Sequence, residues 1–298
     1  MRTGTADETP MRAPAWKMNS YGVRYIFHRM TRRLFSALGL LVVLASTLLA
    51  HDMFLKLANY YLAPNSPVSV PLLNGTFSTS ENSIDRVRIA SIALAGPSGR
   101  RDFDTTVVSA RNDTTFFALQ TGEAGTYAIG VATRPNIIPM SGTLFHEYLK
   151  EEGLGRVIAA REKSGIAADS AREQYAKHVK AIVQVGDTRS ASFGTALGYA
   201  AELVPLDNPY AWKRGGALRF RALVNGAPAP GMTVVTGGRT PSGGRLPRRE
   251  LATGADGIVT LRPTGPGVWY LTFISIEPVT AADHNYESRW ATLTFQLR

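Results

Sequence analysis

The sequence predicts a mainly β protein with two antiparallel, immunoglobulin-like β-sandwich domains behind an N-terminal export signal. From Met53 onward, short runs rich in β-branched and aromatic residues recur about every ten residues, between turn-forming Pro, Gly and Asn residues. The chain contains no cysteine, so neither disulfides nor thiolate metal sites are available to hold the fold. Near the N-terminus, a group of arginines precedes a long apolar run, which is typical of a secretory signal.

The export signal is predicted over residues 1–50, where the apolar run 34–50 ends at the small residue Ala50. Cleavage after Ala50 would remove 50 of the 298 residues, leave 248, and make His51 the first residue. The run of 17 residues also lies at the lower limit for spanning a bilayer, so an uncleaved anchor is the alternative. We expect a periplasmic protein that contacts the membrane only through the signal or this anchor.

The first sandwich domain is predicted over residues 51–204, with a helical insertion at about 143–180. Within the insertion, apolar residues recur at helical spacing in the segment 144–149, Gly153 and Gly155 break the pattern, and it resumes over 157–163. A second helix is expected over 167–180. The apolar stripe of that second helix consists of Ala171, Tyr175 and Val179. An insertion of this kind can wall a cleft at one end of a sandwich.

The second, smaller sandwich domain is predicted over residues 205–298, because the chain passes through a Pro-punctuated segment near Pro205 into a new series of strands. Asn225-Gly226 is expected to form a turn, and Asp256-Gly257 a tight hairpin turn. A last strand is expected over 288–297.

The charge of the chain argues against a nucleic-acid partner. Residues 1–50 contain seven of the 33 basic and two of the 23 acidic residues, so the rest of the chain has a formal charge of +5 rather than +10. The basic residues are scattered instead of lying on one face with interleaved aromatic residues. The sequence also lacks a P-loop, a dinucleotide fingerprint, a serine nucleophile elbow and an HExxH helix, so no enzyme activity is expected.

Several segments together resemble a known exported family of unknown function, often described as a periplasmic accessory of nickel and cobalt uptake. They are His51-Asp52 before Phe54, the helical segment 145–154, Tyr175-Ala176-Lys177, Val185-Gly186-Asp187, the linker 202–210, the segment 225–231, Asp256-Gly257 and the segment 287–295. The similarity covers essentially the whole mature chain. In addition, Pro230-Gly231, Asp256-Gly257 and Trp269-Tyr270 are similar to a carboxypeptidase-regulatory or collagen-adhesin-B sandwich, a structural module.

The resemblance implies an exported protein that binds a transition metal, nickel or cobalt first and copper or zinc as alternatives, and passes it to a membrane transporter. His51 is the leading candidate ligand, because a freed N-terminal histidine offers both its amine and its imidazole, donors that suit these ions. His284, in a loop rich in Asp and Glu, and His146, on the expected helix, are the further candidates. His178 is expected to be structural.

Two other hypotheses remain open. The chain could be an envelope β-sandwich module that binds a protein or glycan without any metal. An N-terminal histidine with a second histidine could also support copper redox chemistry on a polysaccharide, although the sequence shows no flat aromatic binding face. Binding of metal at an intact His51 terminus separates these hypotheses.

Overall fold

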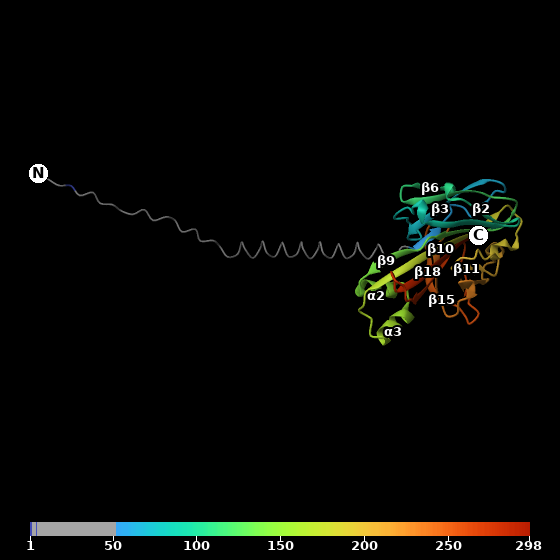
Figure 1. Cartoon of the computed structure of the whole chain (residues 1–298). Coiled ribbons are helices and arrows are strands. Elements are labelled where there is room, and N and C mark those ends of the chain that lie inside the picture. The colour runs from blue at the N-terminus through green and yellow to red at the C-terminus, as the bar shows by residue number, and fades with distance from the viewer. Residues whose placement is uncertain (2–3, 5–51) are drawn as a thin grey trace. The chain divides into compact units, whose positions relative to one another are not determined.

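The computed structural model describes Met1, Gly4 and residues 52–298 (Figure 1). The predicted export signal and His51 lie outside the described residues. Residues 52–298 are mainly β, which confirms the predicted sandwich-like fold class. Among the described helices, none has the length and apolar character needed to cross a membrane.

A ten-stranded sheet forms the middle of the fold. Its strands, in spatial order, are β15 (Arg245–Ala252), β14 (Thr233–Arg239), β17 (Gly267–Pro278), β18 (Tyr286–Leu297), β10 (Ala171–Val185), β8 (Gly125–Thr133), β4 (Ile89–Gly96) and β5 (Gly99–Asp102), while β2 (Tyr61–Leu62) and β9 (Asn136–Met140) also pair with β10. Strand β10 pairs with β18 in parallel and with β8 and β9 antiparallel. Because β17 and β18 follow Pro205 and β8 and β10 precede it, this sheet contains strands from both predicted domains. The division at Pro205 stays a prediction.

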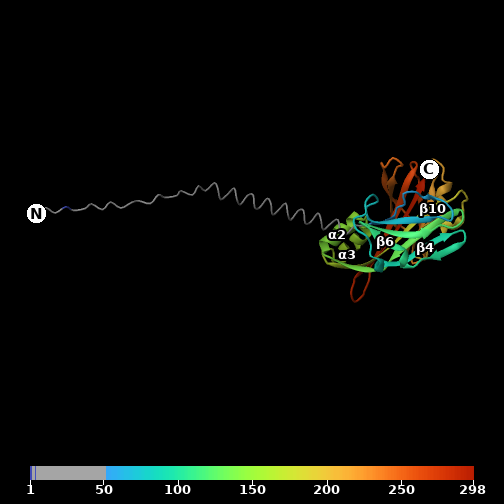
Figure 2. The ribbon, with the colours of Figure 1, turned by 90° about the horizontal axis from the view of Figure 1, so that it is seen from above.

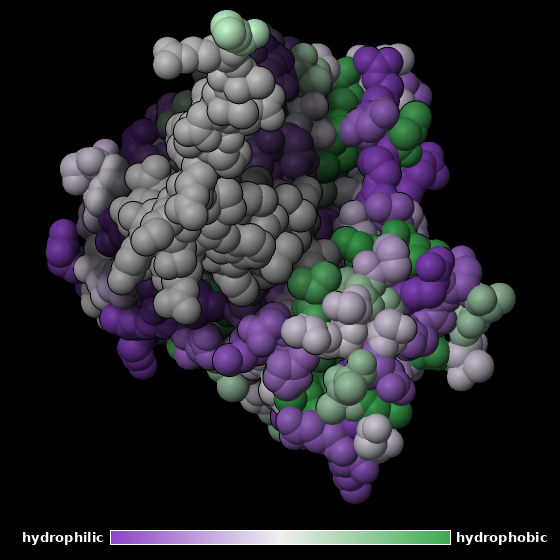
Figure 3. All heavy atoms as spheres, turned by 90° about the vertical axis from the view of Figure 1, so that its left-hand side faces the viewer, coloured by the Kyte–Doolittle hydropathy of each residue, from purple (hydrophilic) through white to green (hydrophobic). Residues whose placement is uncertain are grey.

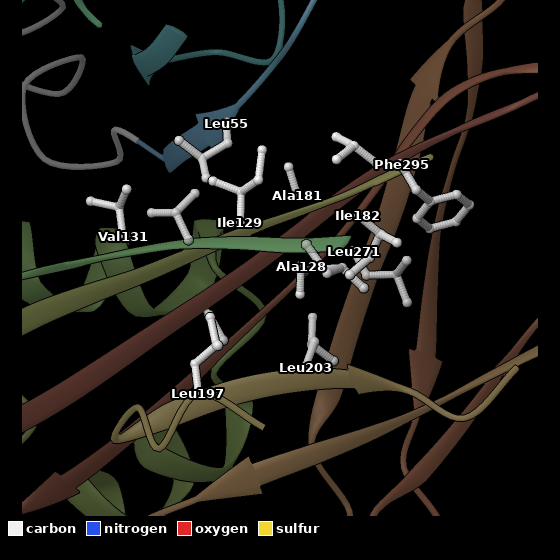
Figure 4. Close-up of a cluster of buried hydrophobic side chains, with 14 of the residues drawn as sticks. Leu55, Ala128, Ile129, Val131, Ala181, Ile182, Leu197, Leu203, Leu271 and Phe295 are labelled. Carbon is white, nitrogen blue, oxygen red and sulfur yellow. The ribbon is translucent and has the colours of Figure 1, made fainter. Parts of the chain in front are cut away.

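Two four-stranded sheets accompany the middle sheet. The first contains β1 (Asp52–Leu55), β3 (Pro67–Gly75), β7 (Thr114–Gln120) and β6 (Val108–Arg111), and the second contains β11 (Ala201–Pro205), β12 (Leu218–Val224), β13 (Ala227–Pro228) and β16 (Ile258–Leu261). Figure 4 shows side chains of the middle sheet packed on both faces, with Leu55 of β1 above β8 and Leu203 of β11 below it. Burial on both faces explains why every residue of β8 is buried.

Strand β1 is fixed to the middle sheet by two threonine hydroxyls of β18. Thr292 Oγ1 donates to the Met53 carbonyl at 2.7 Å, and Thr294 Oγ1 donates to the Leu55 carbonyl at 2.5 Å. These bonds satisfy buried hydroxyls and buried carbonyls together. They also determine where Asp52, the first residue of β1, lies relative to β10 and β18.

Two helices, α2 (Gly142–Glu151) and α3 (Gly155–Lys163), lie next to each other at one end of the sheets (Figure 2). Phe145, Tyr148 and Leu149 of α2 are buried in a second apolar cluster with Tyr286 and Trp290 of β18. Where Figure 3 is not covered by grey atoms, this face shows hydrophilic residues with hydrophobic areas between them. Four short 3₁₀ helices complete the fold: η1 (Arg86–Arg88), η2 (Thr105–Val107), η3 (Ala191–Gly194) and η4 (Pro209–Ala211).

The predicted helix over 167–180 is wrong. The helical insertion ends with α3 at Lys163, and the residues from Ala171 onward form strand β10. The stripe at Ala171, Tyr175 and Val179 fits a strand as well as a helix, since a spacing of four residues keeps side chains on one face of both. The segment forms a strand and not a helix because it pairs with β9, β18 and β8.

Of the two predicted turns, one is confirmed and one is corrected. Asn225 and Gly226 have φ values of 50° and 78° and connect the paired strands β12 and β13, as a type I′ hairpin turn requires. Asp256-Gly257 also forms a turn, in which Gly257 has a φ of 72°. However, the flanking strands β15 and β16 belong to different sheets, so this turn transfers the chain between sheets and is not a hairpin.

Candidate functional site

Asp52 is the first residue of β1, an edge strand of the first four-stranded sheet. Its Oδ1 atom is buried and has no hydrogen-bond partner. Burial raises the pKa of this carboxyl to about 6, against the lowering effects of the positive charges of Lys177 and Arg248. A buried carboxylate oxygen without a partner is costly, so a group that supplies one would stabilise this position.

Glu152 provides a second carboxyl close enough to Asp52 to influence its charge. It follows the last residue of α2, where its backbone N–H caps the helix by donating to the Tyr148 carbonyl at 3.0 Å. Burial and the negative charge of Asp52 raise the pKa of the Glu152 carboxyl to about 8. The two carboxyls therefore disfavour each other's ionisation, a pattern found often at functional sites.

Lys177 is the cation that these carboxyls share. It lies on β10 opposite Trp290 of β18, and its Nζ is 4.4 Å from the centre of the Trp290 ring. Burial lowers the pKa of Lys177, whereas Asp52, Glu152 and Glu173 raise it. Desolvation thus opposes the positive charge of the lysine, while the nearby carboxyls favour it.

A hydrogen-bonded chain supports the wall of this site under α2. Glu173 Oε1 accepts a bond from the Tyr148 hydroxyl at 3.1 Å and another from the Ser288 hydroxyl. Ser288 in turn accepts from Trp290 Nε1 at 3.1 Å. Burial raises the pKa of Glu173, while its bonds from Ser288 and Tyr148 lower it. This chain fixes the orientation of the indole that contacts Lys177.

A cavity of about 200 Å³ opens beside Glu152. Three parts of the chain form its walls: the connection between α2 and α3, strand β17, and strand β14 with the residues just before β14. The lining residues include Leu154, Arg156, Val157, Thr233, Val235, Thr272 and Ile276. Glu152 therefore lines this cavity and also lies close enough to Asp52 to interact with its charge.

The predicted ligand His284 has both ring nitrogens occupied. Its Nδ1 lies 2.7 Å from Asp283 Oδ1, and its Nε2 lies 3.3 Å from Glu287 Oε1. The bond with Asp283 contributes most to raising the pKa of His284, and Glu287 adds to it. An imidazole that donates from both nitrogens is protonated and has no lone pair for a metal. His284 would bind a metal only after these bonds break.

His146 lies on α2 and is partly buried. Within residues 52–298, no group of three or more His, Asp or Glu side chains could hold a metal ion, so neither His146 nor His284 belongs to such a group there. His178, expected to be structural, is buried, and its Nδ1 lies 3.0 Å from the Trp290 carbonyl. The role of His51 as a ligand stays a prediction, because His51 lies outside the described residues.

Sequence reasoning missed Glu152, Glu173 and Lys177. The last two fall within the segment 167–180 that the sequence predicts as a helix, whereas both are buried on β10. A period of two over Glu173, Tyr175, Lys177 and Val179 would have placed all four on one face of a strand. Nothing in the local sequence around Glu152 indicates burial, because the carboxyl is covered by segments distant in the chain.

Comparison with known proteins identifies the family. The family model described as a domain of unknown function, DUF4198, matches residues 48–277. The chain belongs to this family. The matched range includes His51, Asp52, Glu152 and His146, but not His284. None of the curated proteins compared with this DUF4198 sequence matches it.

Solved structures similar to the DUF4198 chain are distant. A crystal structure of trypsin-activated α-2-macroglobulin from Escherichia coli has 12% identity and a TM-score of 0.20, over 83% of this chain and 16% of that chain. A tetra-tandem repeat of a large adhesion protein has 11% identity and a TM-score of 0.19, over 83% of this chain and 49% of that chain. The chain thus spans less than half the length of either structure.

Proposed function

We propose that this DUF4198 protein is an exported metal-binding accessory that delivers nickel or cobalt to a membrane transporter, with His51 and Asp52 as its first ligands. The observation that carries the proposal is the buried Oδ1 of Asp52, which has no partner and belongs to the residue directly after His51. A cation bound there would supply the missing interaction.

The chemistry of the donors suits this cargo. An imidazole, a freed terminal amine and one carboxylate oxygen make a ligand set of nitrogen and oxygen donors. Such a set suits first-row divalent transition-metal ions better than it suits calcium or magnesium. The described residues hold no group of three candidate ligands, so the site depends on His51. Lys177 lies nearby and would be repelled by the incoming ion, which favours reversible binding over permanent retention.

Calorimetric titration of the exported protein with nickel, cobalt, copper and zinc tests the proposal, with intact mass measured on the same material. We expect a mass that begins at His51 and one tightly bound ion. His51→Ala should abolish this binding, and Asp52→Asn should weaken it by about tenfold or more, as expected when one charged ligand becomes neutral.

His284→Gln is the matched control, since it removes a histidine whose nitrogens already contact Asp283 and Glu287. It should leave nickel and cobalt binding unchanged. A different N-terminus, or binding that survives His51→Ala, would overturn the proposal. Preference for copper together with oxidative turnover of a polysaccharide would point to the copper enzyme, and absence of metal binding to an envelope interaction module.

A further inference from the structure

We propose that a patch of positive charge beside β1 is the docking surface for an acidic segment of a partner protein. The patch consists of Lys56, Arg239 and Arg245 together with the aromatic residues Phe77 and Tyr270, and we call it the basic patch. That this partner receives the metal rests on the proposed function, whereas its acidic character rests on the basic patch alone.

Lys56 and Arg239 lie close together although they are far apart in the sequence. Lys56 Nζ is 4.9 Å from the centre of the Phe77 ring. Arg239 donates from Nε to the hydroxyl of the next residue, Ser78, at 3.0 Å. Burial lowers the pKa of Lys56, and the positive charge of Arg239 lowers it further. Because the two cations repel each other, a negatively charged group placed near both would be attracted by both.

Arg245 adds a third positive charge directly opposite Arg239. The two arginines pair across the neighbouring strands β15 and β14, so their side chains leave the sheet on the same face, where like charges destabilise the strand pair. Within the described part of the chain, neither arginine forms an ion pair with a carboxylate, and neither does Lys56. By contrast, Arg248 on the same strand is paired with Glu250 at 3.0 Å. The uncompensated charges therefore favour a partner that carries negative charges.

The hydroxyl of Tyr270 adds a hydrogen-bond donor next to these cations. Its ring crosses β14 at Gly237, where a Cβ atom would come within 2.7 Å of the hydroxyl oxygen. Burial and the charge of Asp52 raise the pKa of Tyr270, while the charges of Arg248 and Arg239 lower it. Among the described residues, this hydroxyl has no hydrogen-bond partner. A free donor beside uncompensated cations suits a carboxylate, which accepts hydrogen bonds on both oxygens.

The recessed position of two cations favours a flexible segment over a flat anionic surface such as a bilayer. Lys56 and Arg239 are partly buried, and the Phe77 ring that Lys56 contacts is buried, whereas only Arg245 is exposed. A carboxylate at the end of a flexible side chain can reach groups in this position. A bilayer surface mainly contacts cations that project from the protein.

The edge of the middle sheet next to the basic patch is poorly suited to pairing with an added strand. Strand β15 is an edge strand, but Pro247 lacks an N–H group, and the pairing register with β14 shifts between Thr236 and Gly238. Both features discourage strand addition. The acidic segment would therefore be held by its side chains.

The basic patch also adjoins the candidate functional site. The charge of Arg248, next to the patch on β15, lowers the pKa of Asp52 and of Glu152, and Asp52 in turn acts on Tyr270. A partner docked on the patch would thus lie beside the proposed ligand Asp52. Carboxylates of an acidic partner would then be available to receive the metal ion.

Fluorescence anisotropy of a labelled hexaglutamate peptide, titrated with the exported protein at pH 7 in chelator-containing buffer, tests the proposal. We expect hexaglutamate to bind and hexaglutamine not to bind. Raising the salt concentration from about 0.1 M to about 1 M should weaken binding severalfold, because the Debye length falls from about 10 Å to about 3 Å. Arg239→Gln/Arg245→Gln should weaken it about tenfold, as expected for two lost surface ion pairs. Tyr270→Phe, which keeps the ring, should weaken it severalfold.

Lys213→Gln/Arg214→Gln is the matched control, because it removes the same charge from exposed residues after η4 and should leave the affinity unchanged. His51→Ala should bind hexaglutamate like the unmodified protein, so a failure of metal binding and a failure of docking are distinguishable. Equal losses in the two double variants would show that net charge alone matters and would overturn the proposal. Absence of hexaglutamate binding would also overturn it, and binding only to phosphatidylglycerol vesicles would identify a membrane as the partner instead.

Discussion

Strand β10 buries one lysine on each face, and the two lysines have different surroundings. Lys180 lies in a closed arrangement: its Nζ is 2.6 Å from Glu202 Oε1 and 3.2 Å from the Thr195 carbonyl. Glu202 also accepts the backbone N–H groups of Leu197 and Gly198, at 2.7 and 3.2 Å. On the opposite face, Lys177 is surrounded by several carboxyls, among which Asp52 has an oxygen without any partner.

The comparison shows that burial of a charge does not by itself mark a functional site. Burial lowers the pKa of both lysines. In the Lys180–Glu202 pair, the lysine Nζ and both carboxylate oxygens have hydrogen-bond partners within the fold, as a structural ion pair requires. Around Lys177, three carboxyls surround one cation and one oxygen is unsatisfied. An incomplete set of partners is therefore the better sign of a ligand.

The largest expected effect comes from breaking the closed pair. Lys180→Met would leave Glu202 buried without its cation, and we expect a loss of about 3–5 kcal/mol in the free energy of unfolding, measured by urea denaturation at pH 7. The double variant Lys180→Met/Glu202→Leu should recover a large part of this loss, because it leaves no buried charge. Equal losses in the single and double variants would show that the two side chains do not stabilise each other.

On the opposite face, Asp52→Asn should stabilise the protein, in contrast to the Lys180 variant. The pKa of Asp52 is raised from 3.8 to about 6, so the folded state retains a proton that the unfolded state has already released. The unmodified protein therefore loses stability between pH 3.8 and about 6, whereas the asparagine variant does not titrate there. In chelator-containing buffer, we expect a gain of about 1–3 kcal/mol above pH 6 and no gain near pH 3.5.

Thermal unfolding of both proteins from pH 3.5 to 8 measures this difference. The stability gain of the variant should grow as the pH rises from 3.8, the ordinary pKa of the carboxyl, to about 6, its pKa in the folded protein. Above that pH the gain should be constant. A destabilised variant at pH 7 would show that the ionised Asp52 carboxylate stabilises the fold and that its oxygen is satisfied. A gain that does not depend on pH would show that titration of Asp52 is not its cause. That result would also remove the main support for metal binding at this position.

The contrast within β10 also explains which parts of the fold the sequence can predict. The alternation and turn residues predict the mainly β class, the Asn225-Gly226 hairpin and the last strand, because these signals are local. The segment of β10 from Ala171 to Lys180 is rich in Ala, Glu, Gln, Lys and Arg, which favour helices. Its strand conformation depends on β9, β18 and β8, whose contacts local propensity cannot represent.

The candidate site is harder to predict for the same reason. The position of Asp52 after His51 is visible in the sequence, but strand β1 is held by threonines of β18 that bond to Met53 and Leu55, each pair separated by 239 residues. Glu173 and Lys177 would be solvent-facing on an isolated helix or strand. They become buried because α2, β1 and Trp290 cover this face of β10. Partners this distant in sequence are set by the tertiary fold and not by any local motif.

The smallest effect is expected from the chain that supports Lys177. Tyr148→Phe removes the hydroxyl that donates to Glu173 at 3.1 Å, while Ser288 continues to donate to the same carboxyl. We expect a loss of about 0.5–1.5 kcal/mol in the free energy of unfolding, the usual contribution of one hydrogen bond. Urea denaturation at pH 7 measures it, and Tyr175→Phe, whose hydroxyl accepts a longer bond of 3.3 Å from Asn136 near the surface, is the control.

The same pair of variants shows whether this chain matters for the site as well as for stability. Losing one of two donors makes the Glu173 carboxylate harder to form, so Tyr148→Phe should raise the pKa of Glu173 further. A protonated Glu173 supports the charge of Lys177 less, and the pKa of Lys177, followed by NMR of its Nζ, should fall. Tyr175→Phe should leave it unchanged. If Tyr148→Phe and Tyr175→Phe change the pKa of Lys177 equally, the hydrogen bonds between Tyr148, Glu173 and Ser288 contribute to packing alone.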